Sequence, residues 1–333
     1  MKLIKFLILL FLLNFSKVYA KEEANFDQWK IKFKERVLAN NISEKTFNLT
    51  MSNAKFLPNV IKYDRYQPEF YEDTNTYISK RTSKKKVLKG LNFYSSNEDL
   101  INDVEKIYNV EKELLLSLMG IETNYGKYLG KMDIISSLAT LSYDKRRSEF
   151  FTKELLILLK LIDNNQINYK TLYGSWAGAF GFFQFMPSTI KNYAIDFDKN
   201  EYINLKTSND AYASAANYLN KMGWNSNSHC FYRIELKENI SPKYLNVSAK
   251  KLVNKKKFKY FKKFIKDSKN FDFIDENLNV AIITPDKDIV ENAEILKPAY
   301  IVFDNYEIIL KWNRSLRFAL AVCTLKDYLK NEL

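Results

Sequence analysis

The sequence is poor in the residues on which many catalytic and metal sites depend. Its 333 residues include one histidine, two cysteines and eight glycines. A single histidine (His229) excludes a His-rich zinc site and argues against a Ser-His-Asp triad. Two cysteines exclude a four-cysteine zinc ribbon, an iron–sulfur cluster held by cysteines alone and a disulfide-dense scaffold. Active sites built on a single carboxylate or on backbone hydrogen-bond donors remain compatible with this composition. The hydrophobic content of 46% is that of a globular chain.

The first twenty residues have the pattern of a secretory signal. Lys2 and Lys5 precede the apolar run Phe6–Leu13, and Val18-Tyr19-Ala20 predicts cleavage after Ala20. The alternative is an uncleaved membrane anchor, for which the run is short. No cysteine follows the run, so a lipoprotein anchor is not expected. We therefore expect an exported, periplasmic protein.

The chain is strongly basic. Its net charge of +13 becomes +10 without residues 1–20, because they hold three lysines and no acidic residue. Export argues against nucleic acid as the partner and favours an anionic polymer outside the cytoplasm or a membrane surface. The densest basic run is Lys250–Lys263, with aromatic residues interleaved. A solvated face is its simplest interpretation, and contact with a polyanion is the alternative. We expect a monomer.

Periodicity predicts a mainly helical (α+β) chain with a small β segment. An irregular helical pattern from Asn25 to about Arg81 is interrupted by Pro58 and Pro68. A further helix is expected to begin after a cap at Ser95 or Ser96 and to break at Asn109. Four more helices are expected, at about Glu111 to Asn124 and over Ser148–Ile162, Asp210–Met222 and Ser315–Leu329. Short β-like runs occur at Phe231–Leu236, Val280–Thr284 and Tyr300–Phe303.

Glu122 stands out on the helix predicted to end near Asn124. Leu114, Leu118 and Glu122 are spaced by four residues, so the carboxyl group shares the apolar stripe that should face the core. Desolvation raises the pKa of a carboxyl group and suits it to general-acid chemistry. The alternative is a core glutamate neutralised by an arginine, and the spacing leaves both open.

The segment Gly174–Ser188 holds three of the eight glycines together with several aromatic residues. Small residues let another chain approach closely, and aromatic faces stack against sugar rings. Tight helix packing is the structural alternative.

Four segments carry a resemblance to a known family. GIETNYG (120–126), GSWAGAFGFFQFMPSTIKNYAIDFD (174–198), ANYLNKMGW (216–224) and KWNRS (311–315) follow one another in the order found in the lytic murein transglycosylase B family. Its members are lysozyme-like enzymes that cleave peptidoglycan. The resemblance implies a signal peptide (1–20), a helical N-terminal domain (21–103, with 149–166), a lysozyme-like core (104–224, completed by 306–333) and a small inserted β domain (225–305).

The resemblance also assigns site residues. Glu122 takes the place of the family's single catalytic acid/base. The sugar-binding positions around it are Ser175, Gln184, Arg146, Arg147, Tyr218 and Asn313. Of these, the serine orients the carboxylate, and the arginine pair faces the anionic lactyl-peptide substituents of the substrate. Trp312 stands where many relatives have a tyrosine, which keeps a stacking face and removes a hydroxyl.

The resemblance implies a mechanism with one carboxylate and no required cofactor. Glu122 protonates the oxygen between N-acetylmuramic acid and N-acetylglucosamine, and then takes the proton of the substrate's own 6-hydroxyl. The product is a 1,6-anhydromuramoyl end, whereas an ordinary glycosidase needs a second acid. Two alternatives are a non-catalytic peptidoglycan-binding protein and a hydrolytic muramidase.

Oxygen donors recur at alternate positions from residue 196 onward, as at the start of a calcium loop. The candidate ligands are Asp196, Asp198, Asn200, Tyr202 and Asp210, the last implied by the resemblance as the closing acid. Glu201 stands where such loops have glycine, and Thr207 where they have glutamate. A structural calcium ion is one hypothesis, and an acidic connector between helices is the other.

Cys230 and Cys323 are far apart in the sequence. In an exported chain they could form a bridge between the start of the β segment and the last helix. Two buried free thiols are the alternative.

Overall fold

The computed structural model describes residues 22–66, 72–287 and 289–333. The predicted signal peptide (1–20) and Pro68 therefore lie outside the described residues. The described chain forms two compact units. The first unit comprises residues 22–66, 129–192 and 199–204, and the second comprises 72–128, 193–198 and 205–333.

The first unit is built mainly from helices. Residues 22–39 are helical. The other helices are α2 (Glu44–Met51), α3 (Pro58–Arg65), α8 (Ile134–Tyr143), α9 (Ser148–Asp163) and α10 (Pro187–Tyr193), with a short 3-10 turn at Tyr169–Thr171. Pro58 marks the predicted interruption and begins α3 at the first helical position, where a missing N–H costs nothing. The helix predicted over 148–162 is confirmed as α9, which packs on α8.

A two-stranded ribbon in the first unit carries the start of the glycine-rich segment. Strands β1 (Met132–Asp133) and β2 (Tyr173–Gly174) pair antiparallel. Gly130 packs against this ribbon with φ +83°, and a Cβ there would lie 2.0 Å from the Gly174 carbonyl oxygen. Gly130 and Gly174 therefore permit a close approach of two backbones within the chain.

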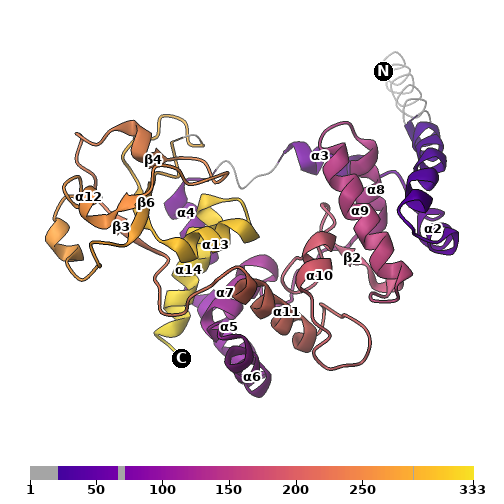
Figure 1. Cartoon of the computed structure of the whole chain (residues 1–333), viewed down its shortest axis with the longest axis horizontal. Coiled ribbons are helices and arrows are strands. Elements are labelled where there is room, and N and C mark those ends of the chain that lie inside the picture. The colour runs from indigo at the N-terminus through magenta and orange to yellow at the C-terminus, as the bar shows by residue number, and fades with distance from the viewer. Residues whose placement is uncertain (1–21, 67–71, 288) are drawn as a thin grey trace, which may run out of the picture. The chain divides into compact units, whose positions relative to one another are not determined.

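Several helices of the second unit gather around α14 (Figure 1). Its helices are α4 (Thr74–Arg81), α5 (Lys84–Ser95), α6 (Glu98–Tyr108), α7 (Lys112–Thr123), α11 (Ser208–Lys221), α12 (Phe258–Lys262), α13 (Asp304–Trp312) and α14 (Leu316–Lys330). Helix α14 packs against α4, α5, α7 and α13. Its predicted start is confirmed, because the Ser315 side chain accepts the N–H of Phe318.

One predicted cap is wrong. Helix α5 continues through Ser95, and Asn97 rather than Ser95 or Ser96 precedes α6. The Asn97 side chain does not cap α6 but donates to the Phe93 carbonyl oxygen at 2.9 Å. The predicted break at Asn109 is confirmed, since this residue takes a left-handed conformation with φ +52°.

The β segment forms a five-stranded sheet within the second unit. Its strands are β3 (Phe231–Ile234), β4 (Leu245–Asn246), β5 (Lys256–Lys257), β6 (Asn279–Ile283) and β7 (Ala299–Val302). They lie in the order β3-β7-β6-β4, with β5 paired to β6, and only the pair β4–β6 is parallel. Two 3-10 turns, Pro242–Tyr244 and Ser268–Phe271, lie between the strands. The expected fold class, mainly helical with a small β segment, is confirmed.

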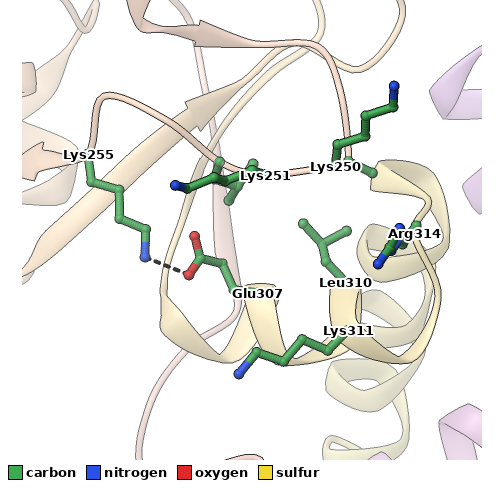
Figure 2. A pocket seen from close by; sticks show the side chains of 9 residues that line it. Lys250, Lys251, Lys255, Glu307, Leu310, Lys311 and Arg314 are labelled. Carbon is green, nitrogen blue, oxygen red and sulfur yellow. Dashed lines mark hydrogen bonds and ion pairs between the residues drawn. The ribbon is translucent and has the colours of Figure 1, made fainter.

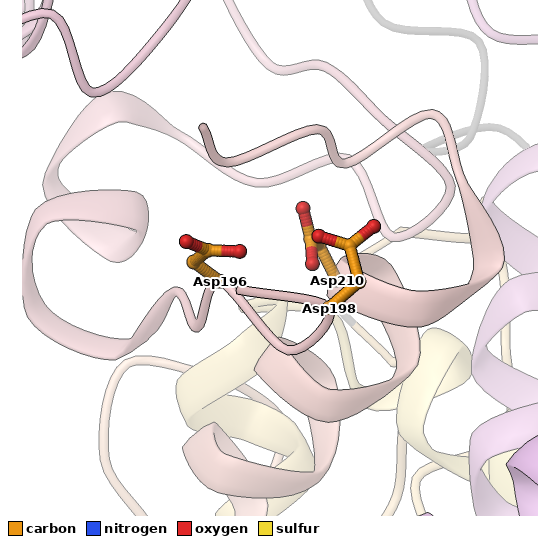
Figure 3. A group of neighbouring side chains, drawn as sticks. All are labelled: Asp196, Asp198 and Asp210. Carbon is orange, nitrogen blue, oxygen red and sulfur yellow. The ribbon is translucent and has the colours of Figure 1, made fainter. Parts of the chain in front are cut away.

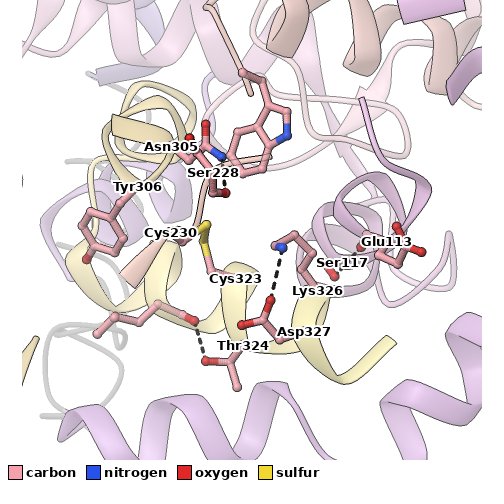
Figure 4. The surroundings of a disulfide bond; sticks show 12 residues. Glu113, Ser117, Ser228, Cys230, Asn305, Tyr306, Cys323, Thr324, Lys326 and Asp327 are labelled. Carbon is pink, nitrogen blue, oxygen red and sulfur yellow. Dashed lines mark hydrogen bonds and ion pairs between the residues drawn. A yellow bond between two sulfur atoms is a disulfide. The ribbon is translucent and has the colours of Figure 1, made fainter. Parts of the chain in front are cut away.

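A disulfide ties the sheet to the central helix of the second unit. Cys230, directly before β3, is bonded to Cys323 of α14 with their Cα atoms 6.2 Å apart (Figure 4). Both residues are buried. Of the two alternatives for the cysteines, the bridge is therefore the one found. Among the described helices, none combines the length and apolar character needed to cross a membrane.

Candidate active site

Glu122 lies in the last turn of α7. Leu114 and Leu118 are fully buried, whereas Glu122 is half-buried. Asn124 then takes a left-handed conformation with φ +52°, and its N–H donates to the Gly120 carbonyl oxygen. The apolar stripe thus runs into the core and ends in a carboxyl group at the edge of the helix.

Residues of α5 pack against and hydrogen-bond to the last turn of α7, which carries Glu122. Gly90 and Gly120 leave room for the phenol of Tyr125, whose oxygen would lie 2.6 and 2.7 Å from a Cβ at those positions. Burial raises the pKa of Tyr125, which keeps the phenol neutral. The Lys86 ammonium donates to the Gly120 carbonyl oxygen at 2.8 Å, and burial lowers the pKa of Lys86 to about 8.

The end of α13 supplies a hydrogen bond to the carboxyl group. The indole N–H of Trp312 donates to Glu122 Oε1 at 3.1 Å. The Trp312 ring stands edge-on to Tyr218 with centroids 5.0 Å apart, and Tyr218 meets Tyr193 at 4.8 Å. Burial raises the pKa of Tyr218 to about 12, so it remains neutral. Sequence reasoning assigned Trp312 a stacking face only and missed its donor, although an indole N–H regularly finds an acceptor.

Asn313 follows Trp312 as the residue that ends α13. Its side chain is half-buried. Its backbone N–H donates to Ile309, whereas its side-chain amide makes no hydrogen bond to any residue that the structure describes. The amide can therefore donate and accept toward a ligand.

In the first unit, the glycine-rich segment fixes Ser175 and Gln184. Ser175 Oγ accepts the Ala179 N–H at 3.0 Å, which leaves the hydroxyl proton to donate elsewhere. Gln184 takes φ +50°, and its side-chain nitrogen donates to the Gly181 carbonyl oxygen at 2.9 Å. The Gln184 amide oxygen can only accept a hydrogen bond.

Arg146 and Arg147, also in the first unit, share one buried acid. Both guanidinium groups form ion pairs with Asp64, whose side chain is only 1% exposed. Arg147 also lies over the Phe151 ring, 5.0 Å from its centroid. Both arginine side chains are nearly half exposed, so each presents donors to solvent. Asp64 was missed because it lies in α3, some eighty residues earlier, and no local pattern links it to the pair.

Three of the predicted metal ligands converge in the second unit. Carboxylate oxygens of Asp196, Asp198 and Asp210 lie within 4.8 Å of one another (Figure 3). Asp210 is fully buried and accepts the Phe197 N–H at 2.9 Å. Like charges this close repel unless a cation or a proton lies between them. A cluster of carboxylate oxygens is also the donor set that calcium prefers.

The missing glycine of the calcium-like loop does not prevent the turn. Glu201 itself adopts the left-handed conformation, with φ +72°. Asn200 Oδ1 accepts the N–H of Tyr202 at 3.0 Å, which tightens the same turn. The backbone therefore takes the shape for which such loops usually employ glycine.

The comparison with known families covers nearly all of the described chain. A family model described as the transglycosylase SLT domain matches residues 25–327. The chain belongs to this family. The resemblance predicted from the four sequence segments is thereby confirmed.

Named relatives of this SLT-domain protein are wall-cleaving enzymes. It is 40% identical over 149 residues to the membrane-bound lytic murein transglycosylase B of Escherichia coli strain K12. That alignment covers 44% of this chain and only 41% of the relative.

Solved structures of the family cover more of the chain. SltB3 of Pseudomonas aeruginosa, in complex with NAG-NAM-pentapeptide, is 29% identical with a TM-score of 0.80, covering 92% of this chain and 79% of its own. The Escherichia coli lytic transglycosylase Slt35, in complex with calcium, is 26% identical with a TM-score of 0.73, and the match covers 93% of this chain and 94% of the Slt35 chain.

Proposed function

We propose that this SLT-domain protein is an exported lytic transglycosylase. It cleaves the β-1,4 bond between N-acetylmuramic acid and N-acetylglucosamine and leaves a 1,6-anhydromuramoyl end, with Glu122 as the single general acid/base. The contact that carries the proposal is the Trp312 indole N–H on Glu122, which fixes one carboxyl group among Tyr218 and Asn313. Family membership supports peptidoglycan as the substrate, because a relative was crystallised with a NAG-NAM-pentapeptide.

The chemistry needs one proton donated by Glu122 and a second proton returned to Glu122 by the substrate. The Glu122 carboxylic acid protonates the bridging oxygen as the bond from that oxygen to C1 of the muramic acid breaks. Positive charge then develops at C1 and the ring oxygen. The Glu122 carboxylate next accepts the proton of the 6-hydroxyl, whose oxygen bonds to C1. No water is consumed, and the acid is restored for another cycle.

The surrounding side chains hold the carboxyl group and the sugars. Trp312 donates to Oε1 and so restricts rotation of the carboxyl group. Ser175 keeps its hydroxyl proton for donation, and we assign it to orienting the same carboxylate. Gln184, Tyr218 and Asn313 contact the sugar rings.

The two arginines recognise the acidic substituents of the substrate. Asp64 neutralises part of their joint charge and fixes both guanidinium groups. Each planar guanidinium still presents donors in a fork that matches a carboxylate. Arg146 and Arg147 are therefore suited to the lactyl-peptide carboxylates.

Digestion of purified sacculi followed by mass spectrometry tests the proposal. We expect muropeptides that are each lighter by one water than the corresponding hydrolysis products. Reducing, hydrated ends would instead identify a hydrolytic muramidase. Binding to sacculi without any released product would identify a wall-binding protein.

Export is part of the same proposal. The signal pattern at residues 1–20 and the basic charge suit a periplasmic protein that meets an anionic wall, and we expect it to act as a monomer. The membrane surface remains the second anionic partner that the charge predicts.

A structural calcium ion completes the proposal without taking part in the reaction. Asp196, Asp198 and Asp210 would hold the ion, with Asn200 and the Tyr202 backbone as the further ligands of a calcium loop. The ion would offset the mutual repulsion of three neighbouring carboxylates. The Slt35 relative was crystallised with calcium.

Calcium is expected to raise the melting temperature of the protein. At a calcium concentration near one hundred times Kd, one site contributes about 2.7 kcal/mol, which is roughly 5–10 °C for a unit of this size. Excess chelator should reverse the shift, and magnesium should produce less of it. Asp210→Asn is expected to abolish the response. A melting curve unchanged by calcium and by chelator would contradict the site.

A further inference from the structure

We propose that a basic pocket beside α13 binds the anionic stem peptide of the wall strand on which Glu122 acts. This inference rests on the proposed function. The pocket has a volume of about 500 Å³ and lies between the segment 249–255 and the outer face of α13 (Figure 2). Five cationic side chains line it: Lys250, Lys251, Lys255, Lys311 and Arg314. The anionic ligand that they recognise is a carboxylate-bearing peptide.

Most of the positive charge in the pocket is uncompensated. Glu307 is the one acidic residue of the lining, and it bonds to Lys255 at 2.6 Å. Burial disfavours the charge of Lys255, but the hydrogen bond and attraction from Glu307, with help from Asp304, outweigh it and raise the pKa of Lys255. The other four cations are exposed and form no ion pair with any residue in the described ranges. Four charges are thus available to an anionic ligand.

The pocket is also partly apolar. Leu252 and Leu310 are buried among its lining residues, beneath the cationic groups. A peptide offers both kinds of partner, because its small side chains can pack on leucine while its carboxylates meet lysine and arginine. A concave site of this volume suits a short peptide. A flat membrane surface would instead contact a protruding face of the protein.

One helix, α13, carries part of the pocket lining and also the residue that bonds to Glu122. Glu307, Leu310, Lys311 and Arg314 are spaced along one face of α13 and the turn after it. Lys311 directly precedes Trp312, whose indole bonds to Glu122. The Trp312 side chain leaves α13 in another direction from the pocket lining, and we assign the peptide in this pocket to the strand on which Glu122 acts.

The test measures binding of two uncleavable ligands to the whole exported chain. They are the N-acetylglucosamine–1,6-anhydromuramic acid disaccharide with its pentapeptide and the same disaccharide without it. Lys311→Gln/Arg314→Gln is expected to weaken binding of the peptide-bearing ligand about tenfold and to leave the peptide-free ligand unaffected. The matched control, Lys256→Gln/Lys259→Gln, also removes two charges, from the part of the basic run Lys250–Lys263 that does not line the pocket, and should change neither affinity.

Three results would overturn the inference. They are an unchanged affinity for the peptide-bearing ligand, an equal loss for both ligands, or an equal loss in the control variant. Anionic phospholipid vesicles form a further arm, in which loss of vesicle binding with retained peptide affinity would assign the pocket to the membrane instead. Equal melting temperatures exclude misfolding. Neither ligand contains the scissile bond, so this outcome is separate from the product analysis that tests the proposed function.

Discussion

Glu122→Gln is expected to bind sacculi and to release almost no anhydromuropeptides. The amide keeps the size of the carboxyl group and can still accept the Trp312 N–H, but it cannot transfer a proton. Loss of both the acid and the base step should lower kcat by about 10³–10⁴-fold. Product release from sacculi, measured by mass spectrometry alongside sacculus binding, checks this. Substantial anhydro product from the folded variant would show that another residue performs the chemistry.

Trp312→Phe supplies a graded comparison for the same site. Phenylalanine keeps an aromatic ring against Tyr218 and removes the N–H that bonds Glu122. A hydrogen bond to a charged group contributes about 1.5–3 kcal/mol, so kcat should fall roughly 10–100-fold while KM changes little. Ser175→Ala should likewise be less severe than Glu122→Gln. A Trp312→Phe loss confined to KM would mean that the indole binds substrate and does not position the carboxyl group.

The largest effect on stability is expected from Cys230→Ala/Cys323→Ala. The bridge joins residues 93 positions apart, and closing a loop of that size restricts the unfolded chain by about 4–5 kcal/mol in the chain-entropy account. We therefore expect the second unit to melt roughly 10 °C lower in the double variant. Calorimetry of the oxidised wild type and the variant measures the difference. Reductant should lower the melting temperature of the wild type and leave the variant unchanged.

Thiol counting provides the independent check on the bridge. Denatured, unreduced wild type should contain no titratable thiol, and reduction should reveal two. Two titratable thiols before reduction would remove the basis for the expected loss of stability. Single alanine variants are poor substitutes for the double variant, because each leaves one buried thiol free to form mixed disulfides.

Much of the fold follows from local patterns. Helix α9 begins at the predicted Ser148, and α7 ends within one residue of the predicted Asn124. Both could be predicted because periodicity and terminal residues act over a few positions. The β runs were also located to within two residues. The wrong cap at Ser95 or Ser96 shows the limit of this reasoning, since three polar residues in succession offer equivalent starts and packing of α5 decides among them.

The sequence supplies the residue types of the candidate site but not their contacts. Spacing placed Glu122 on an apolar stripe, and the family motif singled it out as the acid. Its indole donor comes from 190 residues further along the chain, and Asp64 reaches its arginines over some eighty residues. Such pairs depend on tertiary packing, which one sequence without aligned relatives does not reveal. The same is true of the pocket, whose two sides come from segments about fifty residues apart.

The disulfide bears on when the enzyme becomes dangerous to the cell that makes it. The bridge lies in the unit that carries Glu122 and Trp312, and it can persist only in an oxidising compartment. For the exported protein proposed above, the cytosol keeps both thiols reduced before export, so the unit that carries Glu122 is least stable there. On the same proposal, the bond forms after export, in the compartment that holds the wall. Maturation of the fold and access to the substrate therefore coincide in one place.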